Sequence, residues 1–164
     1  METVVVGVDG SVGSREALTW AVREARTRRA RLVAVYVYTP PNEPLEGSRA
    51  LAVPASLAQP ISVAADPATR QRRDDEARQR ADDLIKEMLS DVGARGLDVE
   101  RKPIPDRRPA EVLIDHSKRA DLLVVGSRGL GGFKGLLLGS VAQHCIRWAR
   151  CPVLVVREGV IVDA

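Results

Sequence analysis

The chain has 164 residues, of which 45% are hydrophobic and 29% charged, a balance that fits one globular domain with an ordinary core. Aromatic residues make up only 3%, which argues against a sugar-binding cleft or a single-stranded nucleic-acid platform, because such sites stack ligands on aromatic rings. The net charge is +3, but basic and acidic residues are interleaved without a recognised DNA- or RNA-binding motif, so we expect no nucleic-acid partner.

Neither the cysteines nor the N-terminus indicates an extracellular or membrane protein. Cys145 and Cys151 form neither a disulfide framework nor a metal-binding pattern. Residues 1–3 lead directly into an apolar stretch without a basic region or cleavage site, and no apolar run approaches the ~20 residues that span a bilayer. We therefore expect a cytoplasmic protein with no membrane partner.

Four short apolar runs predict buried parallel strands, since near-continuous β-branched sequence requires cover on both faces of a sheet. They are Val4–Val8, Leu32–Tyr38, Leu122–Val125 and Val153–Val156. A fifth run, Leu97–Pro103, alternates apolar and charged residues. Because proline removes a backbone donor, Pro103 indicates an edge strand.

Helical patterns lie between these strands, over residues 14–25, 77–92, 109–114 and 140–149. Ser14 is the expected N-cap of the first, and Pro109 suits the first turn of the third. Gly93 or Gly96 is expected to end the second. Alternating strands and helices predict an α/β fold, a Rossmann-like doubly wound five-stranded parallel sheet with helices on both faces.

The whole chain, 1–164, is expected to form a single domain. Residues 39–67 are rich in Pro, Ala and Ser without a clear period, which predicts a long surface loop after the second strand. Residues 158–164 are expected to form a tail.

The segment after the fourth strand is rich in glycine, from Gly126 to Ser140. Glycine lets a backbone come close to phosphate without a Cβ, successive N–H groups can surround an anion, and Gly139-Ser140 leads into a helix whose N-terminus favours phosphate. Lys134 stands where a dinucleotide-binding GxGxxG would need glycine, and the Gly-Lys-Ser/Thr of a Walker A loop is absent.

The spacing Gly126-x2-Gly129-x9-Gly139-Ser140 resembles the ATP-binding signature of the universal stress protein family. The sequence around residues 8–11, the run 121–129 and the ending Cys151-Pro152 followed by four apolar residues are similar to the same family. The resemblance covers nearly the whole chain except residues 39–67 and the last few. It implies strand order 3-2-1-4-5.

The resemblance also implies a set of nucleotide-binding residues. Asp9 would bind the ribose or adenine, the backbone of Val37 the adenine, and the glycine segment the ribose and phosphates. The full set is Val8, Asp9, Ser11, Val37, Gly126, Arg128, Gly129, Gly132, Gly139, Ser140 and Val141. The implied ligand is ATP, with Mg²⁺ or Mn²⁺ carried on its phosphates rather than in a protein metal site.

Each assignment has a simpler alternative. The glycines could serve only as turns, Asp9 could cap the first helix, and Arg128 could be an exposed loop charge. Asp106-Arg107-Arg108 stands where the family usually has a glycine, and the two arginines are interpreted as surface charges that could instead reach the nucleotide. His116 and His144 lie within helical patterns, so we assign no catalytic residue.

The expected function is that of an ATP-binding regulatory stress-response protein with little or no hydrolysis and an unidentified protein partner. Alternatives are a slow ATPase or adenylyl-transferring relative, a cyclic-AMP binder, and a nucleotide-independent dimeric interaction module. An adenylyl-transfer enzyme usually has Ser-Gly-Gly-x-Asp after its first strand, whereas residues 9–13 read Asp-Gly-Ser-Val-Gly.

A homodimer is expected through the fifth strand. Its residues, Val153, Leu154, Val155 and Val156, form an apolar edge without internal charge or proline, and such an edge favours pairing with another strand. Related proteins of the resembled family dimerise there. The alternative is that residues 160–162 fold back over this edge.

Overall fold

The computed structural model describes residues 1–41, 66–131 and 137–159. In this part the elements follow one another as β1 (Thr3–Val8), α1 (Val12–Arg28), β2 (Arg31–Tyr38), α2 (Pro67–Asp91), β3 (Val99–Pro105), α3 (Pro109–Ser117), β4 (Leu122–Gly126), α4 (Ser140–Trp148) and β5 (Val153–Val156). Most of the predicted 39–67 loop and the residues of the tail from 160 onward lie outside the described residues.

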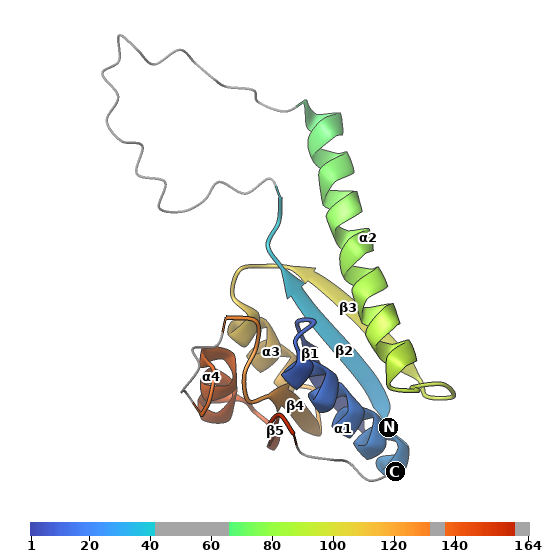
Figure 1. The fold of residues 1–164 in the computed structure, drawn as a ribbon, viewed down its shortest axis with the longest axis vertical. Coiled ribbons are helices and arrows are strands. Elements are labelled where there is room, and N and C mark those ends of the chain that lie inside the picture. The colour runs from blue at the N-terminus through green and yellow to red at the C-terminus, as the bar shows by residue number, and fades with distance from the viewer. Residues whose placement is uncertain (42–65, 132–136, 160–164) are drawn as a thin grey trace, which may run out of the picture.

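The strands form one five-stranded sheet in the order β3-β2-β1-β4-β5, with every neighbouring pair parallel (Figure 1). The predicted α/β class and strand order are therefore confirmed. Helices α1 and α2 pack on one face of the sheet, and α3 and α4 pack on the other.

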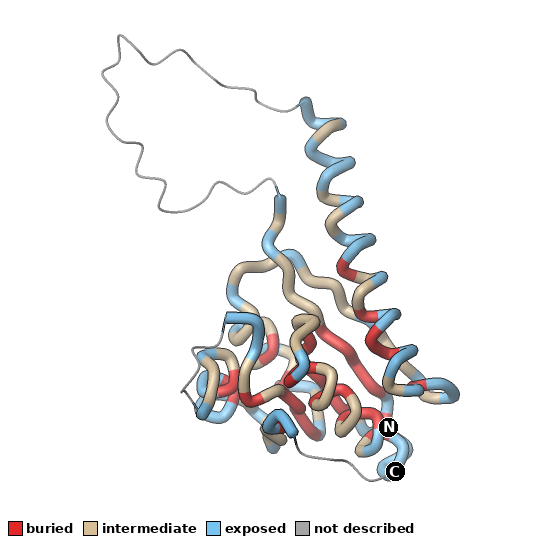
Figure 2. Tube along the Cα trace, viewed as in Figure 1, coloured by how far each residue is buried: buried red, intermediate tan, exposed pale blue. Residues whose placement is uncertain are grey.

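The apolar strands are buried on both faces because each face has its own core (Figure 2). In β1, Val4 and Val6 contact the α1 and α2 side, whereas Val5 between them contacts the α3 and α4 side. This alternation explains why the sequence of β1 is apolar throughout instead of in every second position.

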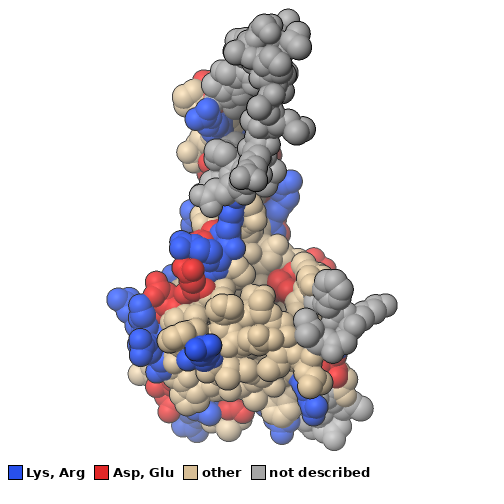
Figure 3. Space-filling model, turned by 90° about the vertical axis from the view of Figure 1, so that its left-hand side faces the viewer, with Lys and Arg blue, Asp and Glu red and all other residues tan. Residues whose placement is uncertain are grey.

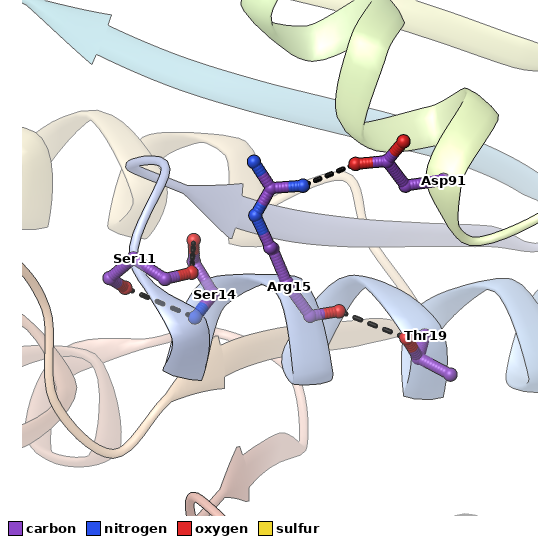
Figure 4. Close-up of polar contacts among 5 residues, drawn as sticks. All are labelled: Ser11, Ser14, Arg15, Thr19 and Asp91. Carbon is purple, nitrogen blue, oxygen red and sulfur yellow. Dashed lines mark hydrogen bonds and ion pairs between the residues drawn. The ribbon is translucent and has the colours of Figure 1, made fainter.

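Helix α1 buries the predicted apolar stripe, but its predicted N-cap, Ser14, is wrong. The N-cap is Ser11, whose Oγ accepts a hydrogen bond from the Ser14 main-chain N–H at 3.2 Å (Figure 4). The Ser14 hydroxyl donates back to the Ser11 carbonyl at 2.9 Å. Ser14 lies inside the first turn of α1, so its side chain is buried and does not cap the helix N-terminus.

Helix α2 begins at Pro67, ten residues before the predicted apolar stripe, and its first half extends away from the sheet (Figure 1). Its buried residues, Ala81, Ile85, Met88 and Leu89, all lie in the second half. The first half is charged and carries local side-chain bonds such as Gln71 to Asp75 at 3.0 Å, which support a solvent-exposed helix.

Strand β3 covers Val99–Pro105, so the predicted bounds of Leu97–Pro103 were two residues too early. It is an edge strand, as predicted. The bonds from Leu32 N to Asp98 O and from Asp106 N to Tyr38 O show that even-numbered residues face β2, so odd-numbered backbone groups point outward. Pro103 and Pro105 both occupy outward positions, where they remove N–H groups from the free edge.

Strand β5 forms the opposite edge and contains no proline. Leu123 N donates to Pro152 O at 3.0 Å and Ser127 N donates to Val156 O at 2.7 Å. Even-numbered residues of β5 therefore face β4, and the backbone groups of Val153 and Val155 point away from the sheet.

Candidate functional site

A cavity of about 440 Å³ lies at the carboxyl ends of the strands. From here the chain leaves β1 toward α1 on one face and leaves neighbouring β4 toward α4 on the other face. Such a switch point is where open α/β sheets bind ligands. The lining residues are Gly7, Val8, Asp9, Ser14, Val35, Val37, Pro109, Leu113, Val125, Gly126, Ser127, Arg128, Gly129, Leu130, Gly131, Gly139, Ser140, Val141 and Ala142.

The structure brings nine of the eleven sequence-predicted site residues together in this lining. They are Val8, Asp9, Val37, Gly126, Arg128, Gly129, Gly139, Ser140 and Val141. Ser11 is not among the lining residues, because its side chain caps α1. Gly132 lies outside the described residues.

Asp9 joins the turn after β1 to the loop after β4. Its Oδ1 accepts a hydrogen bond from Ser11 N at 3.0 Å, and its Oδ2 accepts one from Leu130 N, also at 3.0 Å. The cap of α1 is Ser11, so the alternative that Asp9 caps this helix is wrong. The carboxylate fixes the position of residues 127–131, which we call the glycine loop, relative to β1.

The first turn of α4 presents main-chain N–H groups to the cavity. Gly139 is the N-cap, with φ −77° and ψ 163°, and the first helical bond runs from Gln143 N to Gly139 O at 3.0 Å. The amides of Ser140, Val141 and Ala142 precede that bond, and all three residues line the cavity. Together with the positive end of the helix dipole they can bind an anion.

The glycines of this region fall into two groups. A Cβ on Gly129 would lie 2.3 Å from Asp9 Oδ2, and one on Gly126 would lie 2.9 Å from the Gly13 carbonyl oxygen, so packing within the protein requires both glycines. A Cβ on Gly139 would only reach 3.5 Å from Ser127 O, and one on Gly131 would meet no atom of the described residues within 4 Å. Neither of these two has a positive φ. Gly131 and Gly139 line the cavity, and as glycines they allow a ligand to approach their backbone without meeting a Cβ.

An apolar slot forms the other part of the cavity. Val35, Val37 and Val125 project from β2 and β4 onto the face covered by Leu113 of α3. A Cβ on Gly7 would lie 2.8 Å from Leu113 Cδ1, so this glycine lets α3 approach β1. Sequence reasoning selected Val37 and missed Val35, although the two-residue period of a strand places both on one face.

Arg128 lines the cavity, but its guanidinium is paired. Its Nη2 lies 3.0 Å from Glu158 Oε2, and the two side chains are 34% and 39% exposed. The pair is compatible with the alternative of a loop charge at the surface as well as with a role at the cavity. Partial exposure makes this an ordinary surface ion pair that solvent weakens.

Arg107 and Arg108 are not among the lining residues of the cavity. The Arg108 guanidinium contacts Asp106 at 3.3 Å and Glu111 at 2.8 Å. Hydrogen bonds from the Arg108 main-chain N–H and then from its side chain lower the pKa of Asp106. Arg108 thus stabilises the turn before α3, in agreement with its interpretation as a surface charge.

His144 lies in α4, one turn after Ser140. Its ring Nδ1 donates to the Ser140 carbonyl oxygen at 2.8 Å. This contact lies within α4, and the residue remains exposed.

The remaining surface features concern metals, membranes and charge. Within the described ranges, no group of three or more His, Cys, Asp or Glu residues could hold a metal ion. The helices of these ranges include none whose length and apolar character would let it cross a membrane.

Figure 3 shows Lys and Arg side chains interspersed with Asp and Glu side chains on one face of the molecule, so this face does not carry charge of a single sign.

The doubly wound sheet with a glycine-lined cavity at its switch point defines a Rossmann-like α/β protein. Residues 1–157 match the model of the Universal stress protein family, and the chain belongs to that family.

Relatives share both sequence and fold with this chain. A universal stress protein of Mycobacterium tuberculosis is 29% identical over 155 residues, which are 94% of this chain and 47% of the relative, so the chain spans about half of that protein. One of Thermus aquaticus is 32% identical over 158 residues, with 95% and 98% covered. A crystal structure of a universal stress protein in complex with cAMP has a TM-score of 0.63 at 27% identity, covering 96% of this chain and 98% of the other.

Proposed function

We propose that this chain is a regulatory stress-response protein that binds ATP in the cavity between β1 and β4. The adenine would enter the apolar slot beside Val37, and the phosphates would bind at the first turn of α4. The observation that carries this proposal is that three helix-start amides line the same cavity as that slot, together with two glycines at which an added Cβ would meet no described atom closer than 3.5 Å.

Size and chemistry both support a nucleotide. About 440 Å³ lies within the range of small-molecule sites, and apolar walls with a few convergent polar groups are typical of them. The related protein that was solved with cAMP makes an adenine nucleotide a reasonable ligand class for this fold. Ser140 can add its hydroxyl to the phosphate contacts. A Mg²⁺ or Mn²⁺ ion would be carried on the phosphates.

Cyclic AMP is the second candidate ligand, favoured by the solved relative. It has one phosphate, whereas ATP has three and can use the N-terminus of α4 and the glycine loop together. Mass spectrometry of nucleotide released from purified, undialysed protein would identify the bound species. Calorimetry with ATP, ADP, AMP and cAMP would then rank them, and the absence of binding by all four at millimolar concentration would refute the proposal.

Binding rather than turnover is the proposed activity, exerted in the cytoplasm on a partner protein. A hydrolase needs a group that positions the attacking water, and we assign no such residue. ATP hydrolysis should be far below the ~1–10³ s⁻¹ of ordinary enzymes. A rate inside that range that is lost in Ser140→Ala would favour the enzymatic alternative.

We further propose a homodimer through β5, since Val153 and Val155 direct backbone groups outward at an edge that no other strand of the described residues covers. The alternative cover by residues 160–162 lies outside the described residues.

A further inference from the structure

The segment that follows β5 is attached to the cavity and to α1 by side-chain contacts. Arg128 Nη2 donates to Glu158 Oε2 at 3.0 Å. The next residue, Gly159, donates its main-chain N–H to Glu16 Oε1 of α1 at 3.1 Å. Arg128 of the glycine loop therefore holds Glu158, and Glu16 of α1 holds the next residue, Gly159.

Glu158 lies over the start of α1, beside the loop. A Cβ built on Gly13 would lie 3.5 Å from Glu158 Oε1 and 3.0 Å from the Arg128 carbonyl oxygen. Gly13 therefore leaves room for both the loop backbone and the Glu158 carboxylate. The carboxylate is one side chain away from the cavity without being part of its lining.

Asp9 and Arg128 are the charged residues among those lining the cavity. The Asp9 carboxylate accepts two main-chain N–H bonds, so its position is fixed. Among the described residues that line the cavity, Arg128 supplies the cation available to a phosphate, and in this structure Glu158 neutralises its guanidinium. Both partners are about one-third exposed, so the pair is weak enough for a multiply charged phosphate chain to displace the carboxylate.

We propose that Glu158 is a positioning residue that couples nucleotide binding to the C-terminal segment. Without nucleotide, the Glu158 carboxylate holds the Arg128 guanidinium; with a bound nucleotide, the phosphates compete for the same guanidinium. Capture of Arg128 by phosphate removes one of the two contacts and weakens the attachment of residues 158–159 to the loop and to α1. This inference rests on the proposed nucleotide binding.

Calorimetry on the full chain tests the competition. Glu158→Gln should tighten ATP binding about two- to fivefold, the range of ~0.4–1 kcal/mol expected for an exposed ion pair. Adenosine, which has no phosphate, should bind both proteins equally. Asp91→Asn is the matched control. Like Glu158→Gln, it removes one carboxylate from an exposed ion pair with an arginine, but this arginine is Arg15 of α1, which does not line the cavity. It should leave the affinity for ATP within about twofold of wild type.

The Gly159 amide reports the attachment directly, by NMR of protein labelled with ¹⁵N-glycine. Saturating ATP should shift this resonance and speed its hydrogen exchange, whereas adenosine should not. In Arg128→Ala, ATP should no longer affect it. If wild type binds no ATP, the proposed function fails. If wild type binds ATP but Glu158→Gln has the same affinity, or the Gly159 resonance does not respond, the coupling alone is refuted.

Discussion

Gly129 and Gly139 appear equivalent in the sequence signature but have different physical roles. Gly129 is required by its contact with the Asp9 carboxylate, whose Oδ2 would lie 2.3 Å from an added Cβ. Gly139 has an extended backbone that any residue can adopt, and its surroundings would accept a Cβ at 3.5 Å. Only the second position separates ligand binding from folding.

Gly139→Val should therefore reduce ATP affinity at least tenfold, ~1.4 kcal/mol, because its branched side chain enters the proposed phosphate site. The loss of a favourable N-cap residue should cost at most about 1 kcal/mol of stability. Gly129→Ala should instead lower stability itself, since the Asp9–Leu130 bond is disturbed. Calorimetry and urea unfolding of both variants measure the two effects, and unchanged affinity in Gly139→Val would contradict the site assignment.

Cys145 should make stability depend on alkaline pH. Burial raises the pKa of its thiol to about 11, above the ~8.5 of an exposed thiol. The folded state therefore favours the neutral thiol, and this contribution is complete below pH ~8.5 and lost as the pH rises through about 11. Between pH 7.5 and 10, wild type should lose about 1–2 kcal/mol more than Cys145→Ala in urea unfolding. Comparing the two pH values within each variant cancels the cost of the altered side chain, and equal losses would contradict the prediction.

At the scale of elements, the two edges of the sheet differ in their capacity to pair. Val155→Pro removes an outward N–H of β5 without removing a bond to β4, so it should convert a dimer to a monomer. Arg101→Pro is the matched control, because it makes the same change at an outward position of β3. Light scattering at micromolar concentration distinguishes the outcomes. A monomeric wild type would refute the dimer, and a dimeric Val155→Pro would place the interface elsewhere.

Much of this element scale could be predicted from sequence. The apolar runs predicted the strands because parallel strands are covered on both faces, and the order followed from the family resemblance. The predicted bounds of β3 are wrong because they treat Pro103 as the end of the strand. An edge strand can hold a proline at every outward position, so β3 continues to Pro105. Ser11 and Ser14 are both good N-cap residues, and only the helix start at Val12 decides between them.

Many of the residues that line the cavity could be predicted from the sequence, but the contacts among them could not. The spacing of the glycines predicted which segment lines the cavity. The contact of Gly129 with Asp9 depends on β1 and β4 being neighbours, and the pairing of Arg128 with Glu158 depends on where the chain goes after β5. Such long-range contacts have no local signal in the sequence.

At the scale of the whole molecule, nucleotide binding should appear as thermal stabilisation. A ligand that binds only the folded state at 100 times its Kd adds ~2.7 kcal/mol, which for a chain of this size raises Tm by roughly 5–10 °C. Thermal unfolding with and without ATP measures the shift, and Gly139→Val at the same ATP concentration should show a smaller one. An unchanged Tm for wild type at a concentration that calorimetry shows to be saturating would contradict binding to the fold.

The prolines of β3 have a consequence for how copies of this chain can assemble. In the terms of polymer chemistry, a subunit with two reactive ends can propagate a chain, whereas one with a single reactive end can only terminate it. Pro103 and Pro105 remove donors from one end of the sheet, which leaves β5 as the end able to react. Two copies joined through β5 would have consumed both reactive ends, so growth by sheet extension stops at two and a fibre cannot form by this route.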